Sequence, residues 1–421
     1  MKLIRLFIII CCIPLLNGCA NLGKGMVEAF LENENEEDTR ICQIRGEPFQ
    51  GLSPLVKDPD RLAKVLMVHG VGNHIPGYST QLMENLSNEM ALSHIGKNTK
   101  NIALIDPYDN TKKLGNLRIN RLTNEDNSHA LLFYELTWSE ITADQKELLS
   151  YDNSGEYSFR RATVNNVLKK FSNDTTADPL IYLGDSREDI LKAFSQSFCW
   201  MIAADWDDLP VTTSNQACAP SQHSIENLQK NHVAIISHSL GSRITLDGLQ
   251  RIAALFGNVQ NIDRDKYEHA DELVQTFKEL RIPVFMLSNQ LPMLQLGRKL
   301  PAVTGQGDAY CRADGEHYNS RVLSKTSIIA FSDPNDILSY AIPQGFVDKY
   351  VDSRLCADTT NININVAKIV NAFGVDVANP LEAHVAYKND ARIIALMANG
   401  VGNENTSPVI KERCQTLVTS D

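Results

Sequence analysis

Short runs of apolar residues recur along the chain, and each ends in a turn that leads into a longer segment. The runs are KVLMVHG (64–70), ALLFYELTW (130–138), HVAIIS (232–237), IPVFMLS (282–288) and TSIIAFS (326–332). Uninterrupted apolar runs of this length are typical of central strands in a parallel sheet, which helices cover on both faces. We therefore expect a mostly parallel central sheet.

The segments between these runs have the spacing of amphipathic helices. Apolar residues recur at helical intervals in 78–93, 242–256 and 271–281. Strands that alternate with such helices predict an α/β fold with a doubly wound sheet.

Two other segments have weaker patterns. In 361–373, Ile362, Ile364 and Val366 alternate with polar residues, which predicts a half-buried strand at or near the sheet edge. The stretch 106–128 is polar, and we expect a surface hairpin or loop there.

The interval between two of the runs is too long for a simple crossover. Residues 139–231 include the helical stretch REDILKAFSQSFCWMIAADW (187–206), and such an insertion predicts a largely helical cap or lid. Its aromatic residues would either offer apolar surface to lipid or form the core of the cap. They are Phe159, Phe171, Phe194, Phe198, Trp200 and Trp206. The remaining core of the domain is expected in 61–138 and 232–421.

The first residues have the pattern of an export signal. Lys2 and Arg5 precede an apolar run, Leu6–Leu16, that is too short to span a bilayer as a helix. The following Leu16-Asn17-Gly18-Cys19 resembles a bacterial lipobox. The resemblance implies a signal peptide over 1–18 and acylation of Cys19. Residues 19–60 would then be a lipidated N-terminus, a tether and a lead-in, and the protein would lie in the bacterial cell envelope, at the outer membrane. An uncleaved anchor or an ordinary secretion signal is the alternative.

The net charge disfavours one class of partner, and the cysteine content agrees with export. The chain of 421 residues has 40 basic and 51 acidic side chains, a net charge of −11, and loss of Lys2 and Arg5 with the signal would make it −13. Nucleic acid is a poor partner for so acidic a chain. Apart from the signal and Cys19, six cysteines remain, and an even number in an oxidising compartment allows up to three disulfides. They are Cys42, Cys199, Cys218, Cys311, Cys356 and Cys414. None forms a CxxC pair, so neither a zinc nor a redox site is expected.

The segment VAIISHSLGSRITL (233–246) joins an apolar strand to a helix through Ser239. A serine on a tight strand-to-helix turn is exposed to a base, and the next backbone N–H lies at a helix N-terminus. Such a turn requires small residues two positions on either side, and Ser237 and Gly241 meet that requirement. The alternative is a serine that only caps the helix.

A second segment, VLMVHGVGNHIPGYS (65–79), is a strand followed by His-Gly and a glycine-containing turn. With the serine turn, it resembles the α/β-hydrolase superfamily, in particular its lipases and esterases. The resemblance implies an α/β-hydrolase fold in which Val71 and Leu240 supply the oxyanion N–H groups. It also suggests a substrate site near a larger set of side chains. These are His69, Gly70, Asn73, His74 and His238.

The superfamily order Ser, acid, His selects the remaining partners. After the run 326–332, SDPNDILSY offers Asp336, with Asp333 as the competing acid that would only cap the turn. His384 is the only histidine after Asp336. The expected triad is therefore Ser239, Asp336 and His384.

The expected activity is hydrolysis of carboxylic esters through an acyl-enzyme, as in a lipase, phospholipase or carboxylesterase, without metal or organic cofactor. The lipid anchor would hold the enzyme near acyl-ester or lipid substrates. An acyltransferase would use the same triad, and a non-catalytic lipoprotein on a hydrolase scaffold is the third hypothesis. The sequence leaves the acyl chain, the head group and the oligomeric state open.

Overall fold

The computed structural model describes residues 40–151 and 175–417 except 211–215, 258–268 and 373, with a few positions between 162 and 173. The signal peptide, Cys19 and most of the tether, together with Phe159 and Phe171, lie outside the described residues. Within the described ranges, no helix combines the length and the apolar character that a bilayer span requires.

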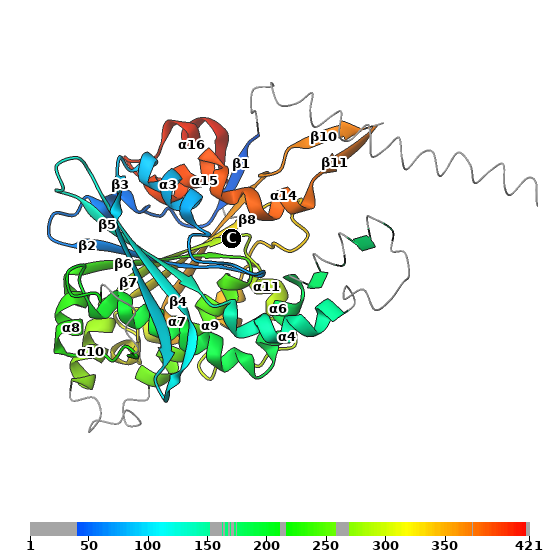
Figure 1. Ribbon diagram of the computed structural model, residues 1–421. Helices are drawn as coiled ribbons and strands as arrows, with labels where there is room; N and C mark the ends of the chain where they lie inside the picture. Colours follow the sequence, from blue (N-terminus) through cyan, green and yellow to red (C-terminus); the bar gives the residue numbers. More distant parts are fainter. Residues whose placement is uncertain are drawn as a thin grey trace, which may run out of the picture.

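A ten-stranded sheet runs through the described part of the chain (Figure 1), in the order β12-β1-β9-β8-β7-β6-β2-β5-β4-β3. Six neighbouring strands are parallel. They are β9 (Ala357–Ile364), β8 (Lys325–Ser332), β7 (Arg281–Leu287), β6 (Asn231–His238), β2 (Leu62–Val68) and β5 (Ala130–Thr137). All five apolar runs that predicted central strands lie in this block, so that prediction is confirmed.

Other strands extend the block on both sides and make the sheet mixed. Beyond β5 lie β4 (Asp109–Thr123) and β3 (Ser93–Asp106), both joined by antiparallel pairing. Beyond β9 lies the antiparallel β1 (Cys42–Arg45), which pairs in parallel with β12 (Cys414–Leu417). A separate hairpin consists of β10 (Ile369–Ala372) and β11 (Val375–Ala378).

Helices cover both faces of the sheet and give two hydrophobic cores (Figure 1). One face packs against α7 (Ser186–Ala203), α8 (Gln222–Gln229), α9 (Leu240–Phe256) and α10 (Ala270–Phe277). The other packs against α2 (Ser53–Val56), α3 (Thr80–Glu89), α15 (Ala391–Asn399) and α16 (Pro408–Arg413). The expected α/β class with a mostly parallel sheet is confirmed.

The shorter helices lie in the connections. They are α4 (Glu140–Ser150), α6 (Ala177–Leu183), α11 (Leu291–Leu294), α12 (Gly307–Cys311), α13 (Phe346–Tyr350) and α14 (Pro380–Val385). Three 3₁₀ turns accompany them, at Tyr318–Ser320, Ser353–Leu355 and Ala386–Asn389.

The described part of the 139–231 insertion is joined to the sheet through α7. Phe194 and Phe198 of this helix are buried in the same cluster as α9 and the sheet. At Gly248 of α9 a Cβ would lie 2.2 Å from the Phe194 ring, so the helices approach closely only because position 248 is glycine. Trp200 and Trp206 are partly buried against this core. Of the two roles considered for the insertion's aromatic residues, these four take the packing role.

One expectation about the sheet is corrected. The polar stretch 106–128 turns back at its start as a hairpin, but most of it is β4, a strand inside the sheet that is buried where β3 and β5 enclose it. The alternating segment 361–373 begins with the end of β9, a half-buried strand near the sheet edge, as predicted. Its outer side is covered by β1, which comes from a distant part of the chain.

Three disulfides use the six remaining cysteines, as the even number allowed. Cys42–Cys414 joins β1 to β12, Cys199–Cys218 joins α7 to the segment before α8, and Cys311–Cys356 joins α12 to the start of β9.

Candidate functional site

Ser239 lies on a sharp turn between β6 and α9. Its φ of 55° and ψ of −125° fall outside the regions that non-glycine residues prefer, and such a conformation typically costs about 1–3 kcal/mol. The turn is tight, because a Cβ at Gly241 would lie 2.4 Å from the carbonyl oxygen of Val68. Ser237, on the other side, is completely buried. The small residues that the sequence places around Ser239 are therefore needed for the turn to pack against β2.

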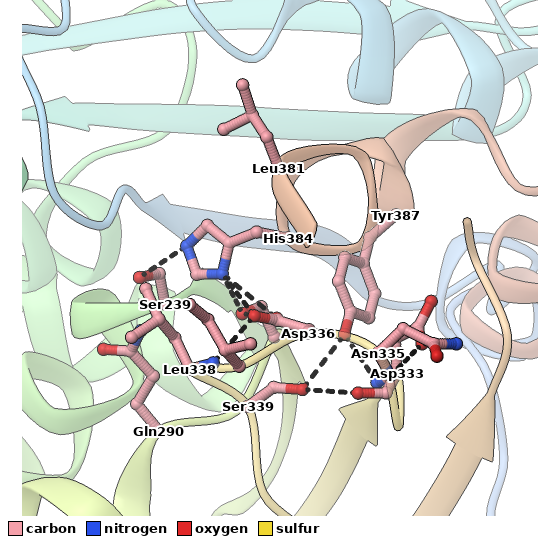
Figure 2. Close-up of polar contacts among 12 residues, drawn as sticks. Ser239, Gln290, Asp333, Asn335, Asp336, Leu338, Ser339, Leu381, His384 and Tyr387 are labelled. Carbon is pink, nitrogen blue, oxygen red and sulfur yellow. Dashed lines mark hydrogen bonds and ion pairs between the residues drawn. The ribbon is translucent and has the colours of Figure 1, made fainter. Parts of the chain in front are cut away.

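The turn brings Ser239 to His384 and Asp336, which come from distant parts of the chain (Figure 2). The Ser239 Oγ lies 3.2 Å from His384 Nε2, and His384 Nδ1 lies 3.0 Å from each carboxylate oxygen of Asp336. Asp336 follows β8, and His384 lies on α14. The three predicted side chains thus form one continuous hydrogen-bonded chain.

Ser288, at the end of β7, is a fourth member of this network that the sequence analysis missed. Its hydroxyl donates to Asp336 Oδ2 at 2.7 Å and lies 2.9 Å from His384 Nδ1. Nδ1 faces three oxygens that accept a hydrogen bond, so it carries the proton. The Nε2 lone pair is then left to face Ser239, which is the arrangement a general base requires. Ser288 also has a φ of 49°, in the left-handed region.

The electrostatics of the network keep Asp336 ionised. Burial opposes the charged form, but the hydrogen bond and charge of His384, with hydrogen bonds from Ser288 and the Leu338 N–H, outweigh it and lower the pKa of Asp336. A carboxylate that accepts several hydrogen bonds is stabilised in its charged form. Asp336 can therefore orient the imidazole and stabilise a positive charge on it.

Asp333, the competing acid, makes different contacts. Its Oδ2 accepts hydrogen bonds from the backbone N–H groups of Val366 at 2.6 Å and Ala367 at 3.0 Å, and its Oδ1 accepts from the Asn335 N–H at 2.7 Å. Its own N–H donates to the hydroxyl of Tyr387. With its carboxylate used to hold the turn, Asp333 caps the segment that carries Asp336.

The His-Gly segment lies directly against the serine turn. A Cβ at Gly70 would come within 2.5 Å of Ser239 Cβ and 2.7 Å of the His238 carbonyl oxygen, so only glycine fits there. This contact places the Val71 backbone beside Ser239. Leu240 is the first residue of α9, where N–H groups have no acceptor within the helix. The role of the Val71 and Leu240 N–H groups as oxyanion donors stays a prediction.

The histidines of this segment hold its shape. His69 is buried and stacks on Trp138, with ring centroids 4.5 Å apart, and its Nε2 accepts the Trp138 N–H at 3.1 Å. Burial lowers the pKa of His69 well below its usual range. His74 Nε2 lies 3.0 Å from the Val71 carbonyl oxygen, while Asn73 is exposed. The predicted contact of these side chains with substrate stays a prediction.

His238, the residue before Ser239, contacts His384. Its Nε2 lies 2.8 Å from the carbonyl oxygen of His384, and its ring lies edge-on to that of His384. Burial and the nearby His384 lower the pKa of His238 to about 3. It is therefore neutral above that pH, and its Nε2–H donates to the backbone that carries His384.

A buried ion pair from the insertion fixes the His-Gly segment. Asp178 of α6 is fully buried, and one carboxylate oxygen accepts the Gly72 N–H at 2.6 Å. The other lies 2.9 Å from Lys146 Nζ and accepts from the hydroxyl of Thr142 at the same distance. The insertion thus sets the position of the segment that carries Val71. No pattern in the sequence marks Asp178, which lies in a polar stretch of a segment with no motif.

The hydroxyl, the imidazole and the carboxylate are arranged as a nucleophile, a base and an orienting acid would be in nucleophilic acyl transfer. Within the described ranges, no group of three or more histidine, cysteine, aspartate or glutamate side chains is placed to hold a metal ion. Comparison of the chain with models of known families, with curated proteins and with solved structures finds no match.

Proposed function

We propose that this protein is a serine hydrolase of the α/β-hydrolase type that cleaves carboxylic esters. The observation that carries the proposal is the hydrogen-bonded chain Ser239–His384–Asp336, together with the strained strand-to-helix turn under the serine. Three further features support an α/β-hydrolase fold. The serine strand β6 lies inside a parallel block, the acid and the histidine follow it in that order, and the His-Gly segment of β2 lies beside it.

The mechanism follows from the protonation state of His384. As the Ser239 oxygen bonds to the carbonyl carbon, its proton passes to His384 Nε2, and Asp336 stabilises the imidazolium. The Val71 and Leu240 N–H groups hold the negative oxygen, each donor being worth roughly 10²–10³ in rate. The ester C–O bond then breaks, and the alcohol leaves with the proton from Nε2. Water attacks the acyl-enzyme through the same base and releases the acid and Ser239.

Side chains around the site favour an apolar ester. Large apolar residues close in the chain to His74, Asp336 and His384 are exposed, namely Ile75, Ile337, Leu381 and Val385. Figure 2 shows Leu381 on the helix that carries His384, pointing away from the network. Exposed apolar side chains close to a reactive site offer surface to the apolar part of a ligand. We therefore expect esters with an apolar acyl chain to be the better substrates.

The experiment is covalent labelling of the full chain with a fluorophosphonate probe, followed by digestion and mass spectrometry. We expect one labelled peptide, with the probe on Ser239, and no labelling of Ser239→Ala. Ser237→Ala is the matched control, because this serine lies two residues away in the same strand and faces the Phe285 carbonyl oxygen. It should still be labelled. If wild type is not labelled, or if the probe modifies another serine, the proposal is wrong.

The nucleophile is covered in the described conformation, where Ser239 has 0% of its surface exposed. A carbonyl carbon must come within about 3–3.5 Å of the attacking oxygen. Access therefore requires a local opening, and the labelling time course should be slow and should accelerate when detergent or a short-chain ester emulsion is added. A fast time course that no additive changes would contradict this expectation, without affecting the assignment of Ser239.

We also propose that Cys19 is acylated and holds the protein at the outer membrane of a bacterial envelope. The lipobox-like Leu16–Cys19 segment and the three disulfides, which need an oxidising compartment, support this proposal. Metabolic labelling with a palmitate analogue tests it, because wild type should incorporate the label and Cys19→Ala should not. An unlabelled, released wild-type protein would refute it.

A further inference from the structure

A cavity of about 370 Å³ lies along α9. Its walls come from α7, from α9, from the segment 295–302 that follows α11, and from 352–354. Arg243, on its wall, is four residues after Ser239, so the cavity begins about one helical turn from the nucleophile. None of the triad residues lines it.

The walls carry an excess of positive charge. Six basic side chains face three acidic ones, Glu188, Asp247 and Asp352, which leaves a formal charge of +3 in a chain whose net charge is −11. The basic ones are Arg187, Arg243, Arg251, Arg298, Lys299 and Arg354. A local charge opposite in sign to that of the whole chain favours a negatively charged ligand.

The carboxylate of Asp247 accepts hydrogen bonds from three of these arginines. Asp247 Oδ1 accepts from Arg243 Nε at 2.9 Å and also from Arg243 Nη2, and its Oδ2 accepts from Arg298 at 2.5 Å and Arg187 at 3.1 Å. Oδ2 also accepts from the Tyr182 hydroxyl at 2.8 Å. Asp247 is buried, and both of its oxygens are already used. Because each guanidinium has five N–H donors, the three arginines retain donors that Asp247 cannot satisfy.

Some of the remaining donors are buried without an acceptor. Gln295 is 6% exposed, and its Oε1 accepts from Arg243 Nη1 at 2.8 Å, which fixes its Nε2 as a donor. That Nε2 and the Nε of Arg187 have no hydrogen-bond partner among the described residues. Lys299 is exposed at the rim and forms no ion pair with any described carboxylate. A buried polar group without a partner costs free energy, and an acceptor in the cavity would remove that cost.

From this donor excess we propose that the cavity along α9 binds an anion of the phosphate class. A phosphate group offers two negative charges and at least three acceptor oxygens, which suits donors that converge from α7, α9 and the segment after α11. A monocarboxylate has one charge and two oxygens and would leave more of these donors unsatisfied. The group would be either free in solution or the head group of an anionic lipid, and both present the same oxygens. Binding does not depend on the proposed hydrolase activity, because no wall residue belongs to the triad network.

The test is isothermal titration of the full chain with inorganic phosphate at constant ionic strength, with chloride as the balancing salt. We expect saturable binding of one phosphate per chain. Arg298→Gln should weaken it roughly tenfold, since one charge-assisted contact is lost. Lys299→Gln, on an exposed side chain that folding does not need, should weaken it several-fold. Glu188→Gln should tighten it, because the change removes a negative charge from the wall.

Two controls make the outcome specific. Lys325→Gln removes the same charge at an exposed ion pair with Asp358 on β8 and β9, and should bind phosphate as wild type does. Ser239→Ala should also bind unchanged, which separates this proposal from the hydrolase. No saturable binding, or equal losses in Lys299→Gln and Lys325→Gln, would overturn the proposal.

A second arm distinguishes the two sources of phosphate. Sedimentation with phosphatidylcholine vesicles containing phosphatidic acid is compared with vesicles of phosphatidylcholine alone, each with and without competing inorganic phosphate. Recruitment that needs phosphatidic acid, is weakened in Lys299→Gln and is competed by phosphate assigns the head group. Phosphate binding without recruitment assigns the soluble anion.

Discussion

Removal of the Ser288 hydroxyl tests whether the triad depends on a fourth residue. In Ser288→Ala, Asp336 loses a 2.7 Å hydrogen bond and His384 Nδ1 loses a neighbouring oxygen at 2.9 Å, while the contacts between Asp336 and His384 remain. A hydrogen bond to a charged group contributes about 1.5–3 kcal/mol, and each 1.36 kcal/mol in a barrier is tenfold in rate. Because Asp336 keeps the Leu338 N–H at 3.0 Å, we expect the lower end, roughly a tenfold fall in kcat with KM nearly unchanged.

The backbone at Ser288 supplies a matched control. Its φ of 49° is strained for alanine but not for glycine, so Ser288→Gly removes the hydroxyl without the backbone cost. Steady-state hydrolysis of a short p-nitrophenyl ester by both variants separates the two effects. Equal losses in kcat identify the hydroxyl as the cause. If Ser288→Gly retains the wild-type kcat, or if both variants do, the hydroxyl does not position the triad.

The pH dependence of stability gives a second readout that does not require activity. The native pKa of Asp336 is lowered, so Asp336 stabilises the fold above its unfolded pKa, and this contribution is lost as pH falls through the native pKa. Ser288 is one cause of the lowering, so its removal brings the native pKa nearer to the unfolded value. The loss of stability in the variants should thus be full at pH 7 and shrink as the pH falls below 3.8, the ordinary pKa of an aspartate. Urea denaturation at several pH values measures it, and a pH-independent loss would contradict this account.

Three further changes give sharp expectations. Gly70→Ala inserts a methyl group 2.5 Å from Ser239 Cβ. We therefore expect about 1–3 kcal/mol lower stability in thermal denaturation and a loss of probe labelling at Ser239. Normal labelling would show that this segment is not packed against the serine. Asp178→Asn leaves the buried Lys146 without its charge partner. Urea denaturation should therefore show a free energy of unfolding about 3–5 kcal/mol lower than that of wild type. A decrease below about 1 kcal/mol would mean that the pair is not buried. Replacing Cys42 and Cys414 together by serine removes a disulfide between residues 372 positions apart. The urea midpoint of unfolding under oxidising conditions should fall by the equivalent of about 2–5 kcal/mol. Under reducing conditions the variant and wild type should have the same midpoint.

The central strands and the three triad candidates were predictable, because local patterns carry them. A short apolar run of six to nine residues bounded by turns indicates a buried strand, and all five such runs are strands of the parallel block. The candidate triad needed only the chain order and the small residues at 237 and 241. His384 was the one histidine that this order allowed, and the structure brings it to Ser239.

The sheet edges were not predictable, because they depend on pairing between distant segments. The alternation in β9 indicated that one of its faces is buried. No local pattern indicated that β1 would pair with its outer side, because the paired residues Cys42 and Ile364 are some 320 positions apart. β4 differs, because its partners β3 and β5 are its neighbours in the chain; it is polar at its exposed end and buried where β5 and β3 enclose it. Strand neighbours far apart in the sequence are a property of topology, and a window of residues does not contain them.

The supporting groups of the candidate site were missed for a related reason. Ser288 ends an apolar run as Ser237 and Ser332 do, so its residue type indicates only the end of a strand, and its role comes from the contact of β7 with the segments that carry Asp336 and His384. Asp178 acts on Gly72 from another layer of the molecule. The candidate triad follows the chain order of the superfamily that it resembles, whereas a group that positions it needs only to reach the right point in space. Any strand end or inserted helix near the site can supply such a group, and sequence patterns therefore indicated the candidate nucleophile but not the groups that hold it in place.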